Sequence, residues 1–288
     1  MNTTATERMA ASVNARLLNL VKERDEDHGL VLTRYALERF LYRLSCSAYK
    51  NEFILKGAML FQLWEQNPHR ATRDLDLLAE GDIGSDAIHK KVVAICNTVV
   101  AEDGLYFDLT GLSIKEIREE ARYGGKRVRF VARLGSARIP IQIDIGTGDA
   151  VTPAPTDIAY PTLLGMAMPQ VLAYPRETVV AEKLEAIIEL GMDNSRMKDF
   201  FDLWFIFTTF KDDPDVLALA VKHTFARREQ PIPLEVPVGL SDAFINDPRK
   251  QTQWKAFLER AVGGKLSLDT VVAIIRDAAM RIFAVARG

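Results

Sequence analysis

The chain has 288 residues, of which 48% are hydrophobic and 26% charged, and its formal net charge is −2. This composition is ordinary for a globular protein, and the length allows one large core or two small ones. The near-zero net charge excludes a polybasic nucleic-acid arm, so any contact with RNA or DNA must come from a local patch.

The only two cysteines, Cys46 and Cys96, have no CxxC or CxxH spacing, which excludes a disulfide framework and a structural zinc site. Residues 1–16 are polar and lack an apolar signal core. No stretch reaches the roughly 20 apolar residues that span a bilayer. We therefore expect a cytoplasmic protein that does not enter a membrane.

The first third of the chain mixes helices with short strands. Apolar residues at helical spacing predict helices over residues 6–24 and 33–48, the second with Thr33 as its N-cap. A strand is expected at 53–55 and a helix at 59–65, ending before the turn signal at 67–68. A strand at 75–78 and a helix at 85–101 follow.

The centre of the chain has the two-residue period of strands, at 106–110, 128–133 and 139–145, with a turn at 123–125. Residues 146–176 are rich in Gly and Pro and are expected to connect two regions. Helices are then predicted at 177–190, 195–210, 213–228, 248–262 and 267–286. The fold class is therefore α+β, with an α/β region over residues 1–165 and a helical C-terminal domain over residues 166–288.

Two aspartates begin the strand predicted at 75–78. Asp74 and Asp76 are two residues apart, so on an extended strand both carboxylates lie on one face and repel one another unless a cation sits between them. Hard divalent ions such as Mg²⁺ take oxygen ligands of this kind. A bare DxD is more often a solvated strand end. Leu75, Leu77 and Leu78, however, indicate an inner strand.

A third carboxylate strengthens the metal hypothesis. Asp144 lies on the polar face of a strand whose other face carries four isoleucines, and a lone carboxylate there is costly without a partner. Asp74, Asp76 and Asp144 on adjacent strands would form a metal-binding triad. Lys56-Gly57-Ala58 joins a strand to a helix upstream, where a glycine and helix N–H groups can hold a triphosphate. The alternative for this motif is a tight turn.

Charged residues also lie on two of the predicted C-terminal helices. Lys183 is one residue from an apolar stripe, and Asp199 and Asp202 share a face of the next helix among Phe and Trp residues. Either these charges pair on the surface, or the aspartates are buried and need a partner such as Lys183. Glu182 and Glu185 are expected to be solvated.

The ordered motifs resemble the AbiEii-type nucleotidyltransferase toxins of type IV toxin–antitoxin and abortive-infection systems, to which the MenT toxins are similar. The resemblance covers about residues 50–205 and is carried by Lys56-Gly57-Ala58, Arg70-x-Thr72-x-Asp74-x-Asp76, Asp144, Glu182-Lys183-x-x-Ala186 and Arg196-x-Lys198-Asp199-x-x-Asp202-Leu203. It implies a DNA-polymerase-β-like nucleotidyltransferase core with a helical C-terminal domain.

The resemblance also implies the activity and its residues. A nucleoside monophosphate would pass from an NTP to an RNA acceptor, the 3′ end of tRNA, and a cognate antitoxin would be a partner. Asp74 and Asp76 match the family's metal ligands, Thr72 the hydroxyl residue before them, Lys183 the NTP-contacting lysine, and Asp199 or Asp202 the C-terminal acidic residue. The broader superfamily has Gly-Ser where this chain has Gly57-Ala58, so Lys56 or Thr72 would have to compensate for the lost hydroxyl.

We therefore expect a two-metal transfer. Asp74 and Asp76 would hold both Mg²⁺ ions, Asp144 the ion nearest the acceptor hydroxyl, and Lys183 would neutralise the triphosphate. Lys56, Gly57, Thr72 and Asp202 would contact the nucleotide, and Asp199 would be catalytic.

Two rival hypotheses remain. The same core could modify a protein or a small molecule such as an aminoglycoside. Alternatively, the chain could be a catalytically silent RNA-binding module. Its basic residues would be Arg118, Arg122, Lys126, Arg127, Arg129, Arg133, Arg227, Arg228, Arg249 and Lys250. Interleaved aromatics are few, Tyr123 and Phe130, which argues against base stacking. A solvated face explains these arginines equally well.

Overall fold

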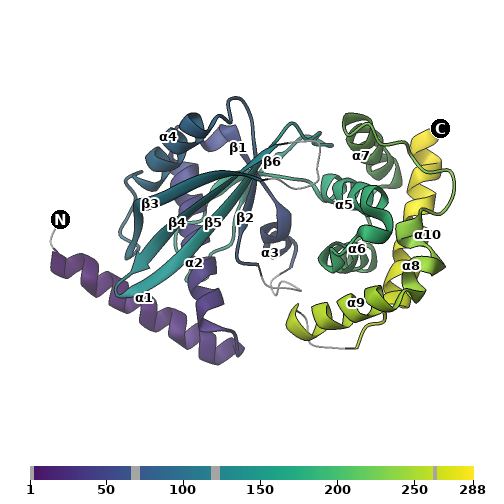
Figure 1. The fold of residues 1–288 in the computed structure, drawn as a ribbon. Coiled ribbons are helices and arrows are strands. Elements are labelled where there is room, and N and C mark those ends of the chain that lie inside the picture. Colours follow the sequence, from purple (N-terminus) through teal and green to yellow (C-terminus); the bar gives the residue numbers. More distant parts are fainter. Residues whose placement is uncertain (1–2, 66–71, 118–123, 262–264) are drawn as a thin grey trace. The chain divides into compact units, whose positions relative to one another are not determined.

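The computed structural model describes residues 3–65, 72–117, 124–261 and 265–288, and its chain forms two compact units (Figure 1). Unit 1 comprises Met1–Gly148 and Thr156–Ala173, and unit 2 comprises Asp149–Pro155 and Tyr174–Gly288. The chain thus crosses into unit 2 for a few residues, returns to unit 1, and then completes unit 2. Residue 165, where the sequence places the domain boundary, lies within the second segment of unit 1.

A mixed seven-stranded sheet organises unit 1, in the order β3-β4-β5-β2-β1-β7-β6. Its strands are β1 (Phe53–Lys56), β2 (Leu75–Ala79), β3 (Leu105–Ile117), β4 (Gly125–Leu134), β5 (Ala137–Thr147), β6 (Thr156–Ala159) and β7 (Gln170–Ala173). β2 runs parallel to β5, and β1 parallel to β7, whereas the other neighbours are antiparallel. β2 is therefore an inner strand, as its leucines predict.

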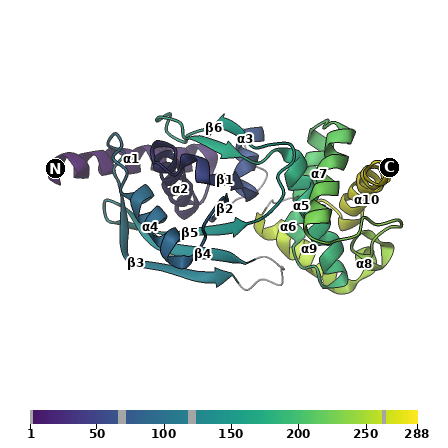
Figure 2. The same ribbon diagram turned by 90° about the horizontal axis from the view of Figure 1, so that it is seen from above.

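Helices cover one face of this sheet. They are α1 (Thr3–Arg24), α2 (His28–Cys46) and α4 (Ser85–Cys96), and α2 packs against β5 and β7, α4 against β3, and α1 against α2 (Figure 2). The ring of Phe40 in α2 lies 6.1 Å from that of Phe107 and 6.2 Å from that of Phe130. Side chains alternate along a strand, so the residues next to Phe107 in β3 and next to Phe130 in β4 point to the opposite face of the sheet.

Unit 2 is helical. Its helices are α5 (Arg176–Leu190), α6 (Met197–Thr209), α7 (Pro214–Arg227), α8 (Asp242–Asn246), α9 (Pro248–Ala261) and α10 (Leu268–Arg287). α5 packs against α7 and α6, and α10 packs against both α7 and α6. Leu184, Phe200 and Val271 have no exposed surface in this core. No helix in the described ranges is long and apolar enough to cross a bilayer.

The structure confirms the order of helices and strands and the α+β class, and it corrects several details. α2 begins at His28, and its N-cap is Asp27, whose carboxylate accepts a hydrogen bond from Leu30 N at 2.8 Å, so the assignment of Thr33 was wrong. The helix predicted at 59–65 is a 3₁₀ turn, Gly57–Leu60, followed by the single turn α3 (Phe61–Trp64). α4 ends at Cys96 rather than near residue 101.

The region predicted as a connection also differs. Within residues 146–176 the chain forms the hairpin of β6 and β7, which extends the sheet beyond β1. Short strands between Gly and Pro residues carry too little periodicity to be recognised. The turn predicted at 67–68 lies outside the described residues, as does Tyr123 of the turn predicted at 123–125.

Candidate functional site

Four charged residues form a row across the centre of the sheet. In the strand register, Lys56 of β1 lies opposite Asp76 of β2, Asp76 opposite Asp144 of β5, and Asp144 opposite Arg127 of β4. Directly opposed residues project from the same face of a sheet. The two carboxylates expected on adjacent strands are thus neighbours, and a cation flanks them on each side.

Gly57 fits against Asp76. Its φ is +74°, in the left-handed region, and a Cβ atom at this position would lie 2.0 Å from Asp76 Oδ2. Both the backbone angle and the close approach therefore require glycine. The sequence explains this glycine by contact with a phosphate. In the structure it makes room for the carboxylate of Asp76.

Asp74 immediately precedes β2 and is oriented by Thr72. The Thr72 hydroxyl donates a hydrogen bond of 2.7 Å to Asp74 Oδ1, and Thr72 is buried. A hydroxyl two residues upstream thus fixes one carboxylate oxygen and leaves the other to accept further partners. The structure shows Thr72 holding Asp74, and its contact with the nucleotide stays a prediction.

Asp144 is held by an arginine that the sequence assigns to RNA binding. Arg127 Nε donates to Oδ1 at 2.8 Å and Arg127 Nη2 to Oδ2 at 2.6 Å, a bidentate ion pair. Gln142 Nε2 donates to Oδ2 at 3.4 Å, and Arg129 donates to Gln142 Oε1 through two nitrogens. The costly lone carboxylate of the sequence interpretation therefore has a partner. The alternating pattern of β4 could have revealed it, because Arg127 and Asp144 occupy polar faces of adjacent strands.

Of the three predicted metal ligands, Asp74 and Asp76 fit a hard divalent cation as a pair. Asp74 and Asp76 supply carboxylate oxygens two residues apart, which suits Mg²⁺. Across the described ranges, three His, Cys, Asp or Glu side chains nowhere gather closely enough to hold a metal ion together. Asp144 is engaged by Arg127, so its place as a third ligand stays a prediction.

A second cluster lies inside unit 2, between α5 and α6. Lys183 Nζ donates to Asp199 Oδ1 at 2.6 Å and to Asp202 Oδ2 at 2.8 Å, and neither aspartate has exposed surface. Arg196 Nε lies 2.7 Å from Asp199 Oδ2. Burial raises the pKa of Asp199, but the charges of Lys183 and Arg196 outweigh it and hold that pKa below its ordinary value. Of the two readings open from the sequence, the buried pairing with Lys183 is the one observed.

The glutamates beside Lys183 are not solvated as expected. Glu185 is buried, and its carboxylate accepts a hydrogen bond of 2.5 Å from Arg228. Arg228 also donates to Asp149 at 3.0 Å and lies 3.9 Å from Glu182. Since Asp149 belongs to the first segment of unit 2, Arg228 fastens that segment to the helices. These partners of Arg228 could not be predicted from the sequence, because they lie far from it along the chain.

The remaining basic residues divide between the two units. Arg228 donates to Glu185 within unit 2, and Lys250 is buried and donates to Asn194 O at 2.8 Å. Arg118 and Arg122 lie outside the described residues. Phe130 is buried under α2 and is therefore not a stacking platform. Arg129 is exposed and donates to a neutral amide, so its charge is directed to solvent.

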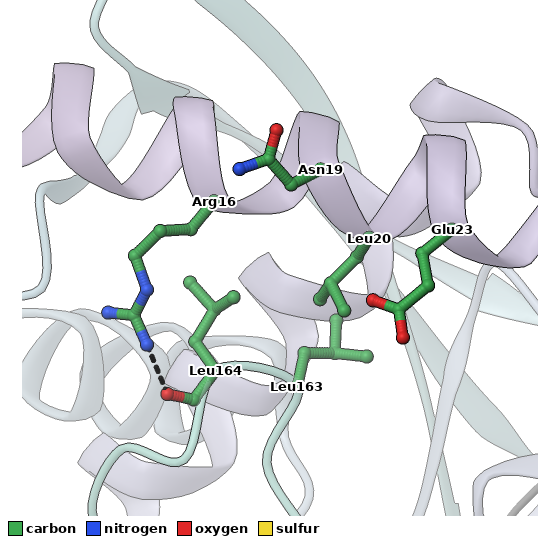
Figure 3. A pocket seen from close by; sticks show the side chains of 6 residues that line it. All are labelled: Arg16, Asn19, Leu20, Glu23, Leu163 and Leu164. Carbon is green, nitrogen blue, oxygen red and sulfur yellow. Dashed lines mark hydrogen bonds between the residues drawn. The ribbon is translucent and has the colours of Figure 1, made fainter.

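A separate hollow of about 370 Å³ lies between α1 and the segment after β6 (Figure 3). Arg16, Asn19, Leu20, Glu23, Leu163 and Leu164 line it. Arg16 Nη2 donates to Leu164 O at 2.5 Å across it. None of the residues predicted for the site lines this hollow.

Comparison with known proteins identifies the family. The family model described as "Nucleotidyl transferase AbiEii toxin, Type IV TA system" matches residues 39–274. The chain belongs to this family. No curated protein matches. Membership implies a nucleotide substrate and an antitoxin partner, as the resemblance in the sequence does.

Two solved structures share the fold. One, a candidate nucleotidyltransferase from H. pylori, has a TM-score of 0.52 at 16% identity and aligns over 91% of this chain and 98% of its own. The other, JHP933 from Helicobacter pylori, has a TM-score of 0.51 at 14% identity over 91% and 94% of the two chains. At these identities the likeness concerns the fold alone. It confirms the nucleotidyltransferase-like architecture.

The close approach of Gly57 to Asp76 predicts that Gly57→Ala displaces the carboxylate. Gly81→Ala is the matched control, because Gly81 also has positive φ, +84°, but a Cβ there would meet nothing within 4 Å. The control should lose about 1–2 kcal/mol of unfolding free energy from the backbone alone. Gly57→Ala should lose more in chemical denaturation. Equal losses would mean that Asp76 moves aside without cost.

The buried cluster predicts that Lys183→Ala destabilises unit 2. Two carboxylates would remain buried without their ammonium, which costs about 3–5 kcal/mol. Lys198→Ala, on the exposed side of α6, should change stability by less than about 0.5 kcal/mol. In the variant the carboxylates ionise less readily, so its deficit should shrink as the pH falls from 7 towards 4. Denaturation at several pH values measures this, and a pH-independent deficit would contradict it.

Proposed function

We propose that the chain transfers a nucleoside monophosphate from an NTP to the 3′ end of an RNA, specifically tRNA, in the cytoplasm. The observation that supports this most directly is the row in which Asp76 lies between Lys56 and Asp144, on a sheet of nucleotidyltransferase architecture. Family membership supplies the nucleotide substrate.

The proposed reaction is an in-line displacement. The acceptor hydroxyl oxygen bonds to the α-phosphorus, the bond from that phosphorus to the bridging oxygen breaks, pyrophosphate leaves, and the hydroxyl proton is released to solvent. Mg²⁺ bound by Asp74 and Asp76 would neutralise phosphate charge, with Asp144 as the further ligand of a two-metal site. Thr72 holds Asp74 in place, and Lys56 brings an ammonium to the face of Asp76.

Lys183 has two roles in the proposed reaction. It would contribute positive charge to the triphosphate, as the family resemblance implies, and it neutralises Asp199 and Asp202. Asp199 and Asp202 accept hydrogen bonds from this ammonium and thus orient it. Direct contact of Asp202 with the nucleotide remains a prediction.

The open face of β3, β4 and β5 supports an RNA acceptor. The register places Lys115, Arg129 and Arg138 on this face, beside Arg127 and Arg133, whose guanidinium groups are ion-paired with Asp144 and Asp108. Opposed and alternate residues share a face. This basic face begins beside Asp144 and is the one that α2 does not cover. A phosphate backbone lying along it would bring a terminal hydroxyl to the carboxylates.

The rivals are less well supported. A silent RNA-binding module would not need glycine beneath Asp76 or a hydroxyl on Asp74. Several of its presumed RNA contacts, such as Arg228 and Lys250, are used inside unit 2. Modification of a protein or small molecule would use the same row, so only an acceptor assay separates it from RNA modification.

The carboxylate pair predicts that Asp76→Asn lowers nucleotidyl transfer by more than about 100-fold, since changes even beyond the direct ligands of a metal cost 10–100-fold. The fold should survive, because asparagine is isosteric and Gly57 leaves its space unchanged. Labelled NTPs offered to total tRNA and cell protein measure both transfer and acceptor. A folded variant with wild-type turnover refutes the site. Label on protein alone refutes the RNA acceptor.

The basic face predicts that Arg129→Gln weakens acceptor use without affecting NTP use. KM for RNA should rise, and the slope of log K against log salt should decrease by about 1. Lys90→Gln is the matched control, because Lys90 is exposed on α4, away from this face. If both variants change the salt slope alike, the contribution is general charge and not a docking face.

A further inference from the structure

The ion pair between Arg127 and Asp144 occupies both oxygens of the third carboxylate in the row. Its two hydrogen bonds, 2.8 and 2.6 Å, have the parallel geometry of a guanidinium on a carboxylate. The side chain of Asp144 is 15% exposed and that of Arg127 31%. The pair is therefore more sheltered than an ordinary surface ion pair, and water screens it less.

The strand register holds this pair in place. Arg127 and Asp144 are directly opposed on antiparallel strands, so no loop has to be ordered to bring them together. A third hydrogen bond reaches Asp144 from Gln142, whose amide is oriented by Arg129. The carboxylate of Asp144 thus accepts hydrogen bonds from Arg127 of β4 and from Gln142 of its own strand, β5.

The other side of Asp144 faces β2. There Asp76 is its direct neighbour, and Asp76 is the carboxylate that Gly57 accommodates. Arg127 occupies one lone-pair site on each oxygen of Asp144 and so leaves fewer for a cation bound by Asp76. The positive guanidinium also repels a cation bound beside Asp144.

We propose that Arg127 competes with a divalent cation for Asp144 and thereby sets how tightly the site holds its second ion. The proposal rests on the proposed function, because it takes Asp74 and Asp76 as cation ligands. Arg127 is then a residue that acts on the metal site through Asp144, and not an RNA contact. Each hydrogen bond from Arg127 to Asp144 thus weakens that carboxylate as a metal ligand.

Binding of Mn²⁺ to the full chain, followed by the loss of the free-ion electron paramagnetic resonance signal, tests this without any enzyme assay. Arg127→Gln should bind Mn²⁺ about tenfold more tightly, because a charge is removed and a ligand is released. Arg127→Lys, which keeps the charge but cannot form the bidentate pair, should lie between wild type and Arg127→Gln. Thermal unfolding verifies that each variant is folded.

Two controls make the result specific. Lys115→Gln removes the same charge one strand further out, opposite Arg127, and should shift Mn²⁺ affinity by less than about twofold. In an Asp144→Asn background, Arg127→Gln should tighten binding by only about twofold, because the contested ligand is gone and only the charge effect remains. Equal tightening by Lys115→Gln, or the full tightening without Asp144, would show an unspecific charge effect and overturn the proposal.

The outcomes also separate this inference from the proposed function. If Asp76→Asn abolishes Mn²⁺ binding while Arg127→Gln leaves it unchanged or weaker, the metal site stands and the competition is refuted. Arg127 would then orient Asp144 and not contest it. If Asp76→Asn and wild type bind Mn²⁺ alike, the carboxylate pair is not a metal site, and both proposals fail.

Discussion

The parallel pairing of β2 with β5 is the constraint on which the candidate site depends. It places Asp76 directly beside Asp144, although 68 positions separate them in the numbering of the chain. Two adjacent carboxylates repel one another, and a shift of one residue would send either of them to the opposite face. Cations on the flanking strands offset this repulsion, because Lys56 of β1 and Arg127 of β4 lie at the same level of the sheet. The row is therefore close to neutral, and the cost of gathering its anions is offset within the sheet.

Unit 2 handles buried acids by a similar arrangement. Asp199 and Asp202 face Lys183 from one turn of α6, and Glu185 faces Arg228 on the other side of α5. A buried carboxylate without a cation would be protonated or would destabilise the fold, so these contacts are structural whatever else they do. The residues that family resemblance assigns to the nucleotide thus also hold α5 to α6. Loss of activity in a Lys183 variant is informative only when stability is measured beside it.

Much of this architecture could be predicted from sequence, and the omissions have physical causes. The strand at Leu75–Ala79 is an almost continuous apolar run and the last long helix has apolar residues at helical spacing, and both are properties of the local sequence. Contacts between residues that are far apart along the chain cannot be predicted from local sequence. Arg127 looks like any cation in a basic stretch until the register sets it against Asp144. Gly57 also makes room for Asp76, a neighbour that is reached only through strand pairing and that the sequence does not reveal. The Thr72–Asp74 bond is local, and an ST-type hydroxyl contact two residues away could have been anticipated.

The same contacts bear on the missing superfamily hydroxyl. Ala58 stands where a serine is usual, and the sequence leaves Lys56 and Thr72 as residues that could compensate. Thr72 already donates its hydroxyl proton to Asp74, and a hydroxyl has a single proton to give. Lys56 carries three donors and a full charge, and it projects from the same face as Asp76. An ammonium attracts a phosphate more strongly than a neutral hydroxyl does, without fixing its geometry as closely. Compensation by Lys56 would therefore preserve the attraction for a triphosphate while relaxing the precision with which it is held.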